Sequence, residues 1–415
     1  MIKQTKRLSK KLLSAVLIFS LASGLTATPW RVMTVSAATS SKSDVVGEIS
    51  GDEMTQTTEN NSSGKSSSGS SSSSSNSSSN NSSSSSNSTP AEKTVITYDI
   101  SHSPNISVTE ISSTAESVKI PDTVRGSNDK TYFVTSIESN AFSNSRSVKD
   151  LEIGNNVETI GSNAFSSSNG LEKVKLGSRV RTIGAGAFQN CVRLNSVTFG
   201  DSVETIGKHA FANNESLTSV SLGNRVTSIG PGAFINNYSL SSLTLGDSIS
   251  NIDRNAFRND VSLKSVTLPA SLTRLSSGVF YGDTHLTSVT FGNRISVIGE
   301  KAFTDTGITS LVIPDSVTDI RESTFRRCYY LTSLTLGSGV RNIAPNAFRG
   351  DQFLTTVTVN TTSLSGVGWK AFGGISHSAE FSITAPKPVF KAEVALIKAS
   401  SLPNSVIFTR VKVNN

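Results

Sequence analysis

The stretch Leu171–Arg193, LEKVKLGSRVRTIGAGAFQNCVR, decides the fold because most of the chain repeats it. Its phenylalanine, Phe188, recurs at an almost constant interval. The first eight copies stand 23 residues apart and the next three steps are 22, 23 and 24 residues: Phe142, Phe165, Phe188, Phe211, Phe234, Phe257, Phe280, Phe303, Phe325, Phe348 and Phe372. A period of this length is typical of a solenoid, in which each repeat forms one coil that stacks on its neighbours.

Apolar residues fall at fixed positions within each repeat. In the quoted copy they are Leu171, Val174, Leu176, Val180, Ile183, Ala187 and Phe188. The Val-x-Leu part alternates with period two, as in a short β-strand with one buried face. A glycine or proline follows this strand, and a second glycine precedes the Ala-Phe pair. We therefore predict a repeat solenoid with one parallel β-strand and a short turn or helical piece per 23-residue coil, in ten to eleven coils capped at both ends.

The pattern L-x-x-V-x-L-G/P-x-x-V-x-x-I-G-x-x-A-F-x-x-C/N resembles the leucine-rich repeat of the BspA-like surface protein family. Lys119-Ile120-Pro121, followed by Val134–Ile137 and Ala141-Phe142, resembles the first repeat of that family, so the resemblance covers about residues 118–374. It implies an arc-shaped leucine-rich repeat domain in a surface or secreted protein, with adhesion to host or microbial partners for some members. It implies no catalysis and carries over no binding residue.

Residues 1–37 are predicted to be a secretory signal peptide. Basic residues precede the apolar run Leu12–Leu25, and Val35-Ser36-Ala37 offers a cleavage site with small residues. An uncleaved membrane anchor is the alternative, but the run has 14 residues and a membrane span needs about 20. We therefore expect a secreted or cell-surface protein with no transmembrane span in the mature chain.

The overall charge of +7 is concentrated in this segment. It holds six Lys and Arg and no acid, which leaves 32 basic against 31 acidic residues in the rest of the chain. The mature chain is thus nearly neutral, and its bulk charge does not favour nucleic acid as a partner.

Residues 38–90 are predicted to be a disordered linker. From Ser62 to Thr89 the segment is almost pure Ser and Asn, a composition that buries too little apolar surface to fold. A glycosylated stalk is the alternative, since Asn76 and Asn87 fit the N-x-S/T acceptor pattern.

Two caps are expected at the ends of the repeat array, which we place at 131–374. The N-terminal cap, 91–130, contains strand patterns at Val95–Ile100 and Ser107–Ile111 and a hairpin or loop at Gly126–Lys130. The C-terminal cap, 375–415, contains a short helix after Pro388 within the stretch Lys387–Lys398 and a closing strand at Ser405–Phe408. Such caps cover the open ends of the hydrophobic stack.

No constellation of residues in the sequence indicates catalysis. Cys191 and Cys328 are six coils apart, about 29 Å at the strand spacing of a sheet, so they cannot form a disulfide. The four histidines are scattered, and neither a nucleophile elbow nor a Gly-rich phosphate loop is present. We predict no enzyme activity, no catalytic residue, no cofactor and no metal site.

Small hydroxyl residues occupy the outward positions of the predicted strands. One column is Ser196, Ser219, Ser242, Ser265, Ser288, Ser310 and Ser333, and the other is Thr198, Ser221, Thr244, Thr267, Thr290, Val312 and Thr335. The simplest reading is that small β-compatible residues fit a curved sheet. A broad polar binding surface is the alternative; ordering of water or ice is disfavoured by curvature.

A better candidate site lies on the loop edge just after the phenylalanines. Here the copies differ from one another and Arg and Tyr gather, which are the residue types enriched in interface hot spots. We call the following residues the loop-edge patch: Arg258, Tyr281, Arg326, Arg327, Tyr329, Tyr330 and Arg349. The alternative is that the tyrosines pack between loops while the Arg stems cover them.

The leading hypothesis is an exported, non-enzymatic binding protein, a bacterial cell-surface or secreted adhesin that binds an extracellular protein or surface macromolecule as a monomer. One alternative is a structural or envelope-associated spacer without a specific ligand. The other is a carbohydrate-binding module.

Overall fold

The computed structural model describes residues 32–35, 48–50, 53–55, 57–59 and 93–412. The chain divides into two compact units, 1–30 and 31–415, and the first lies entirely outside the described residues. Most of the predicted signal peptide and linker therefore also lies outside them.

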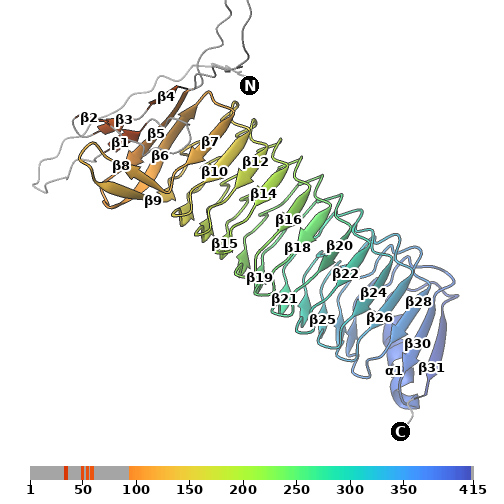
Figure 1. Cartoon of the computed structure of the whole chain (residues 1–415). Coiled ribbons are helices and arrows are strands. Elements are labelled where there is room, and N and C mark those ends of the chain that lie inside the picture. Colours follow the sequence, from red (N-terminus) through yellow and green to blue (C-terminus); the bar gives the residue numbers. More distant parts are fainter. Residues whose placement is uncertain (1–31, 36–47, 51–52, 56, 60–92, 413–415) are drawn as a thin grey trace, which may run out of the picture. The chain divides into compact units, whose positions relative to one another are not determined.

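The second unit is a parallel β-solenoid whose coils stack in sequence order (Figure 1). Each coil contributes one strand to a first row: β7 (Ser117–Ile120), β10 (Asp150–Ile153), β12 (Lys173–Lys175), β14 (Ser196–Thr198), β16 (Ser219–Ser221), β18 (Ser242–Thr244), β20 (Ser265–Thr267), β22 (Ser288–Thr290), β24 (Ser310–Ile313), β26 (Ser333–Leu336), β28 (Thr356–Val359) and β30 (Glu380–Thr384). The pairing is parallel with a step of one repeat, as between Leu151 and Val174. The predicted leucine-rich repeat solenoid is confirmed.

A second, shorter strand row runs along the same coils and was not predicted. It consists of β9 (Thr131–Ile137), β11 (Thr159–Ile160), β13 (Thr182–Ile183), β15 (Thr205–Ile206), β17 (Ser228–Ile229), β19 (Asn251–Ile252), β21 (Arg274–Leu275), β23 (Val297–Ile298), β25 (Asp319–Ile320), β27 (Asn342–Ile343) and β29 (Gly366–Val367). The described residues form about twelve coils rather than ten to eleven, because β7 and β30 extend the first row into both predicted caps.

The segment around each phenylalanine is a turn, and residues 131–374 contain no helix. Its amide groups bond the next coil instead of their own: Phe165 N–H donates to the carbonyl oxygen of Ala187 at 2.8 Å, and Phe188 N–H donates to that of Ala210 at 2.8 Å. Donors used between coils are not available for intrahelical bonds, which explains why the short piece that we expected as turn or helix is a turn.

The repeated phenylalanines form the centre of the core. From Phe165 to Phe372, successive rings are stacked nearly parallel, with centroids between 5.0 and 5.6 Å apart. These rings have no solvent exposure. Each interval between phenylalanines in the sequence therefore corresponds to one step along a continuous column of stacked rings.

The strands at the N-terminal end combine antiparallel and parallel pairing. β5 (Lys93–Asp99) pairs antiparallel with β6 (Asn105–Ser113), and β6 pairs parallel with β9. β8 (Thr123–Arg125) pairs antiparallel with β9, and Gly126 N–H donates to Lys130 across the turn at 2.9 Å, as expected for a hairpin there.

At the C-terminal end, α1 (Lys387–Lys398) covers the residues predicted to be helical. β31 (Ile407–Val411) pairs parallel with β30 and begins two residues after the start of the predicted closing strand. Within the described part of the chain, no helix is long and apolar enough to cross a membrane.

Four short strands fall inside the ranges predicted to be signal peptide and linker. β1 (Val32–Val35) and β4 (Thr57–Glu59) pair antiparallel with β5, and β2 (Glu48–Ser50) pairs with β3 (Glu53–Thr55). The predicted boundaries at 37 and 90 stay predictions.

Candidate functional site

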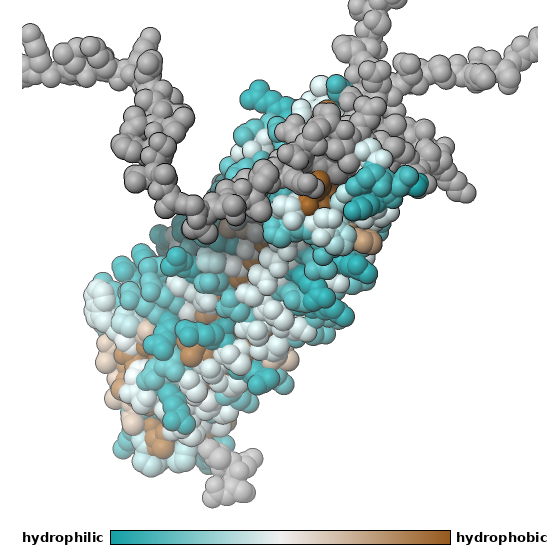
Figure 2. All heavy atoms as spheres, turned by 90° about the vertical axis from the view of Figure 1, so that its left-hand side faces the viewer, coloured by the Kyte–Doolittle hydropathy of each residue, from teal (hydrophilic) through white to brown (hydrophobic). Residues whose placement is uncertain are grey.

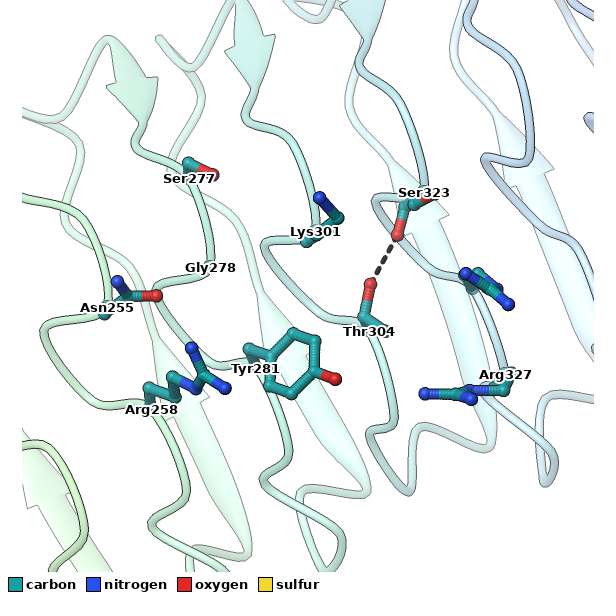
Figure 3. Close-up of a pocket in the computed structure, with 10 residues that line it drawn as sticks. Asn255, Arg258, Ser277, Gly278, Tyr281, Lys301, Thr304, Ser323 and Arg327 are labelled. Carbon is teal, nitrogen blue, oxygen red and sulfur yellow. Dashed lines mark hydrogen bonds between the residues drawn. The ribbon is translucent and has the colours of Figure 1, made fainter. Parts of the chain in front are cut away.

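The loop edge is shaped by two left-handed backbone positions in most coils, two residues before and two residues after the phenylalanine. The first of these positions has φ of 56° at Asn255, 64° at Gly278, 54° at Lys301 and 55° at Ser323. Figure 3 shows that side chains from this position and from the position three residues later, as with Asn255 and Arg258, line the same hollow. Each coil thus presents two variable side chains side by side.

Four neighbouring coils enclose a pocket of about 280 Å³ on this edge. We call it the basic pocket, because its lining contains four cationic side chains and no carboxylate: Asn255, Arg258, Ser277, Gly278, Tyr281, Lys301, Thr304, Ser323, Arg326 and Arg327. The pocket is therefore a local concentration of positive charge on this edge.

Two small residues leave room for the pocket. Gly278 presents no side chain between Asn255 and Lys301, where the positive φ also favours glycine. Thr304 is buried between Tyr281 and Arg326 of the adjacent coils, and its hydroxyl donates to the carbonyl oxygen of Ser323 at 2.5 Å. The hollow exists because the repeat positions hold small residues here and large ones on either side.

Arg258 and Tyr281 form one wall. The guanidinium carbon of Arg258 lies 4.5 Å from the centre of the Tyr281 ring, a cation–π contact. The Nε atom of Arg258 is buried and has no hydrogen-bond partner among the described residues. Arg258 therefore has hydrogen-bonding capacity that the protein itself does not use.

The opposite side of the pocket is organised by ion pairs. Arg327 donates to Asp305 through Nε (2.6 Å) and Nη2 (2.5 Å), and this bond raises the pKa of Arg327. Lys301 donates to Glu300 at 2.6 Å, which raises the pKa of Lys301. Arg326, like Arg258, forms no ion pair with any described residue.

The structure brings four residues of the loop-edge patch together in the basic pocket: Arg258, Tyr281, Arg326 and Arg327. The other three do not line it. Tyr329 and Tyr330 follow Arg327 on the same coil and are 41% and 62% exposed, while Arg349 lies one coil further and donates to Asn346 at 3.4 Å. Whether any of these residues binds a partner stays a prediction.

Several lining residues were missed from the sequence: Asn255, Ser277, Gly278, Lys301 and Ser323. The loop-edge patch was predicted by comparing the residues that follow the phenylalanine in each copy of the repeat. The column two residues before it varies just as much between copies, and it would have identified all of these residues except Ser277.

The two predicted hydroxyl columns lie in register on the first strand row. Ser219 pairs with Ser242 and Ser265 with Ser288, and these side chains are exposed. The face shown in Figure 2 carries mainly hydrophilic and intermediate residues, with hydrophobic spheres only in small groups. The hydroxyl columns are polar and repetitive, with Val312, which is 65% exposed, as a departure in the second column.

A buried polar column runs behind the loop edge, three residues after each phenylalanine. The backbone N–H of one member donates to the side-chain Oδ1 atom of the next member along the chain. These bonds run from Cys191 to Asn214 (2.8 Å), Asn214 to Asn237 (3.0 Å), Asn237 to Asp260 (2.8 Å), Asp260 to Asp283 (2.9 Å) and Cys328 to Asp351 (2.9 Å). Both cysteines are free and buried, and burial raises the pKa of the Cys191 thiol to about 12. Their thiols donate to phenylalanine carbonyl oxygens of the preceding coil, which is a structural role.

The repeat identifies the family to which the chain belongs. A family model described as BspA type leucine rich repeat region matches in six copies over residues 135–264 and 250–379, more than half of the chain. The chain is a BspA-type leucine-rich repeat protein. The resemblance suggested by the sequence is confirmed.

Several solved structures of bacterial proteins are similar to this BspA-type chain. A leucine-rich repeat protein from Bacteroides ovatus is 22% identical, with 76% of this chain and 98% of that chain covered and a TM-score of 0.51. A leucine-rich cell surface protein from Faecalibacterium prausnitzii is also 22% identical, with coverage of 72% and 95% and a TM-score of 0.39. A leucine-rich repeat protein from T. pallidum is 26% identical, with coverage of 50% and 85% and a TM-score of 0.39.

The Bacteroides ovatus structure supports the solenoid fold of the BspA-type chain and nothing beyond the fold. Comparison with curated proteins finds no match. Among the described residues, no group of three or more His, Cys, Asp or Glu side chains could hold a metal ion.

Proposed function

We propose that this BspA-type protein is an exported, non-enzymatic binding protein that attaches to host or microbial macromolecules as an adhesin. The observation that carries the proposal is the basic pocket, whose lining holds four cationic side chains, two of them arginines that form no ion pair within the described part of the chain. A solenoid supplies a long rigid surface for such side chains with little effect on stability, because the buried positions maintain the fold.

The alternative of a spacer without a specific ligand is less well supported. A spacer needs only the buried repeat and a soluble surface, and it gains nothing from collecting four cationic side chains in one hollow. Like charges brought together repel one another, and a binding role offers a reason to retain them.

Binding should be measured with the full chain on immobilised extracellular-matrix proteins and on whole microbial cells, by biolayer interferometry and flow cytometry. We expect saturable binding to at least one of these surfaces, and a marked loss in the double variant Arg258→Gln/Arg326→Gln. The matched control is Arg225→Gln/Arg294→Gln, which removes two exposed arginines from a different turn of the coils. Absence of saturable binding to every surface would contradict the proposal.

Export is part of the same proposal, and the predicted signal peptide supports it. Expression in a bacterial host should place the protein in the medium or on the cell surface, with an N-terminus immediately after Ala37 when it is sequenced by mass spectrometry. An intact N-terminus on protein retained in the cytoplasm would contradict export.

A further inference from the structure

We propose that the basic pocket binds the carboxylate of an acidic sugar, a uronic or sialic acid residue within a glycan. This inference rests on the proposed function, because it names the class of ligand that the loop edge would hold. Arg326 would pair with the carboxylate, the sugar ring would occupy the hollow above Thr304, and Arg258 on the other wall would donate to hydroxyl oxygens of the sugar.

The charges in the pocket favour a planar anion. Asp305 already pairs with Arg327, and Glu300 with Lys301, so Arg258 and Arg326 are the lining cations without an ion pair among the described residues. A guanidinium offers a planar fork of donors that matches the two oxygens of a carboxylate.

The size of the pocket favours a single ring. Its volume of about 280 Å³ lies just below the range of roughly 300–1,000 Å³ that is typical of sites for drug-sized ligands. Figure 3 shows Tyr281 between Arg258 and Thr304, with its hydroxyl directed toward the Arg327 side of the hollow. One sugar residue is therefore the unit that fits, and the rest of a glycan would continue along the edge.

The uncharged lining favours a sugar over an acidic peptide. The amide of Asn255 lines the same pocket as the cations and suits the hydroxyl groups of a pyranose, and the hydroxyl of Ser277, which donates to the carbonyl oxygen of Glu300 at 2.9 Å, can still accept a hydrogen bond there. A Glu or Asp side chain would engage the guanidinium groups and leave the amide of Asn255 without a ligand group to bond. Peptides are also commonly held at a free sheet edge or in an apolar groove, and the pocket lies within the stack of coils and has a polar lining.

The test is calorimetric titration of the full chain at low ionic strength with four probes: trigalacturonate, 3′-sialyllactose, lactose and a hexaglutamate peptide. We expect at least one acidic sugar to bind at least tenfold more tightly than lactose and hexaglutamate, and added salt to weaken it. Comparison of the two acidic sugars distinguishes uronic from sialic acid as the source of the carboxylate.

Two variants locate the site. Arg258→Gln/Arg326→Gln should lower the affinity for the acidic sugar at least tenfold, whereas Arg225→Gln/Arg294→Gln should leave it unchanged. Thr304→Gln keeps every charge and fills the hollow with the residue type found in the same column at Gln189, so it should also lower the affinity at least tenfold. Thermal melts of each variant verify that the fold is intact.

The outcomes separate this inference from the proposed function. Tighter binding of hexaglutamate than of either acidic sugar, or equal losses in the pocket and control variants, would overturn the inference. If matrix or cell binding persists in the pocket variants, the sugar site is wrong while the adhesive function stands. If the acidic sugar binds and no macromolecular surface does, the adhesive function is wrong and the pocket assignment stands.

Discussion

Single residues of the buried polar column show how the repeat tolerates acids in its interior. Asp260 and Asp283 occupy the position held by Asn214 and Asn237 in the preceding coils, and one carboxylate oxygen of each accepts a backbone N–H. The other oxygen is buried without a partner. Burial raises the pKa of both carboxyl groups well above the ordinary value, so each is favoured as the neutral acid, which has nearly the shape of an asparagine.

These raised pKa values predict a pH-dependent stability. In the unfolded chain Asp ionises near pH 4, whereas burial in the folded protein opposes ionisation. The contribution of each Asp to the stability of the folded protein is therefore fully present below pH 4 and is lost as the pH rises toward the folded-state pKa. Replacing Asp260 and Asp283 with Asn should therefore stabilise the protein at neutral and alkaline pH by about 1–3 kcal/mol per site, with little effect near pH 4.

Urea denaturation of Asp260→Asn, Asp283→Asn and the wild type between pH 4 and 9 measures this effect. The reverse change, Asn237→Asp, serves as the control and should destabilise the protein increasingly as the pH rises. A difference in unfolding free energy that does not vary with pH would show that ionisation of the column plays no part.

At the scale of the elements, the turns after the first-row strands depend on how closely consecutive coils approach. A Cβ atom at Gly177 would overlap the carbonyl oxygen of Gly154 in the preceding coil. At Gly223, in the same column, a Cβ atom would meet nothing within 4 Å. This difference coincides with the first row being divided into separate sheets between β14 and β16.

Alanine substitutions should therefore differ at two positions that look equivalent in the sequence. Gly177→Ala should destabilise the protein by about 1–3 kcal/mol through backbone displacement, whereas Gly223→Ala should be neutral or stabilising by up to about 1 kcal/mol through the lower entropy of the unfolded chain. Thermal melts of the two variants provide the measurement. Equal effects at both sites would refute the close approach at Gly177.

The elements that the sequence predicted well are those specified by residues inside one repeat. The Val-x-Leu alternation around Val174 specifies a first-row strand, and the residues after Pro388 indicate α1. The turn around Phe188 could not be distinguished from a helix, because its amide hydrogen bonds reach the neighbouring coil. The second strand row was missed for the same reason, since two residues such as Thr182-Ile183 form a strand only when they pair with the equivalent residues of the neighbouring coils.

The candidate site was only partly predictable for a related reason. Arg258, Tyr281 and Arg326 share one column, so a comparison of the copies indicated them. The pocket itself depends on the small size of Gly278 and Thr304, which is informative only once the neighbouring large side chains are known to face the same hollow. The hollow depends on small side chains at two positions, and the amino-acid composition does not reveal it.

At the scale of the whole molecule, stability is the sum of coils that each contact only their neighbours. Phe234 lies in the middle of the aromatic column, with ring centroids 5.3 Å from both Phe211 and Phe257. Phe142 lies near its N-terminal end, where it contacts Phe165 at 6.0 Å in an edge-on arrangement instead of stacking. Removing these two rings should therefore have different consequences for unfolding.

Phe234→Ala should cost about 3–5 kcal/mol and divide the array into two weakly coupled halves, because every path of contact between the ends passes through this coil. We expect a broadened calorimetric transition or two transitions, with a van't Hoff enthalpy below the calorimetric value. Phe142→Ala should instead loosen only the N-terminal end, which hydrogen exchange would localise to β5–β11, and leave the main transition sharp. A single sharp transition in Phe234→Ala at the wild-type midpoint would show that the aromatic column does not couple the coils.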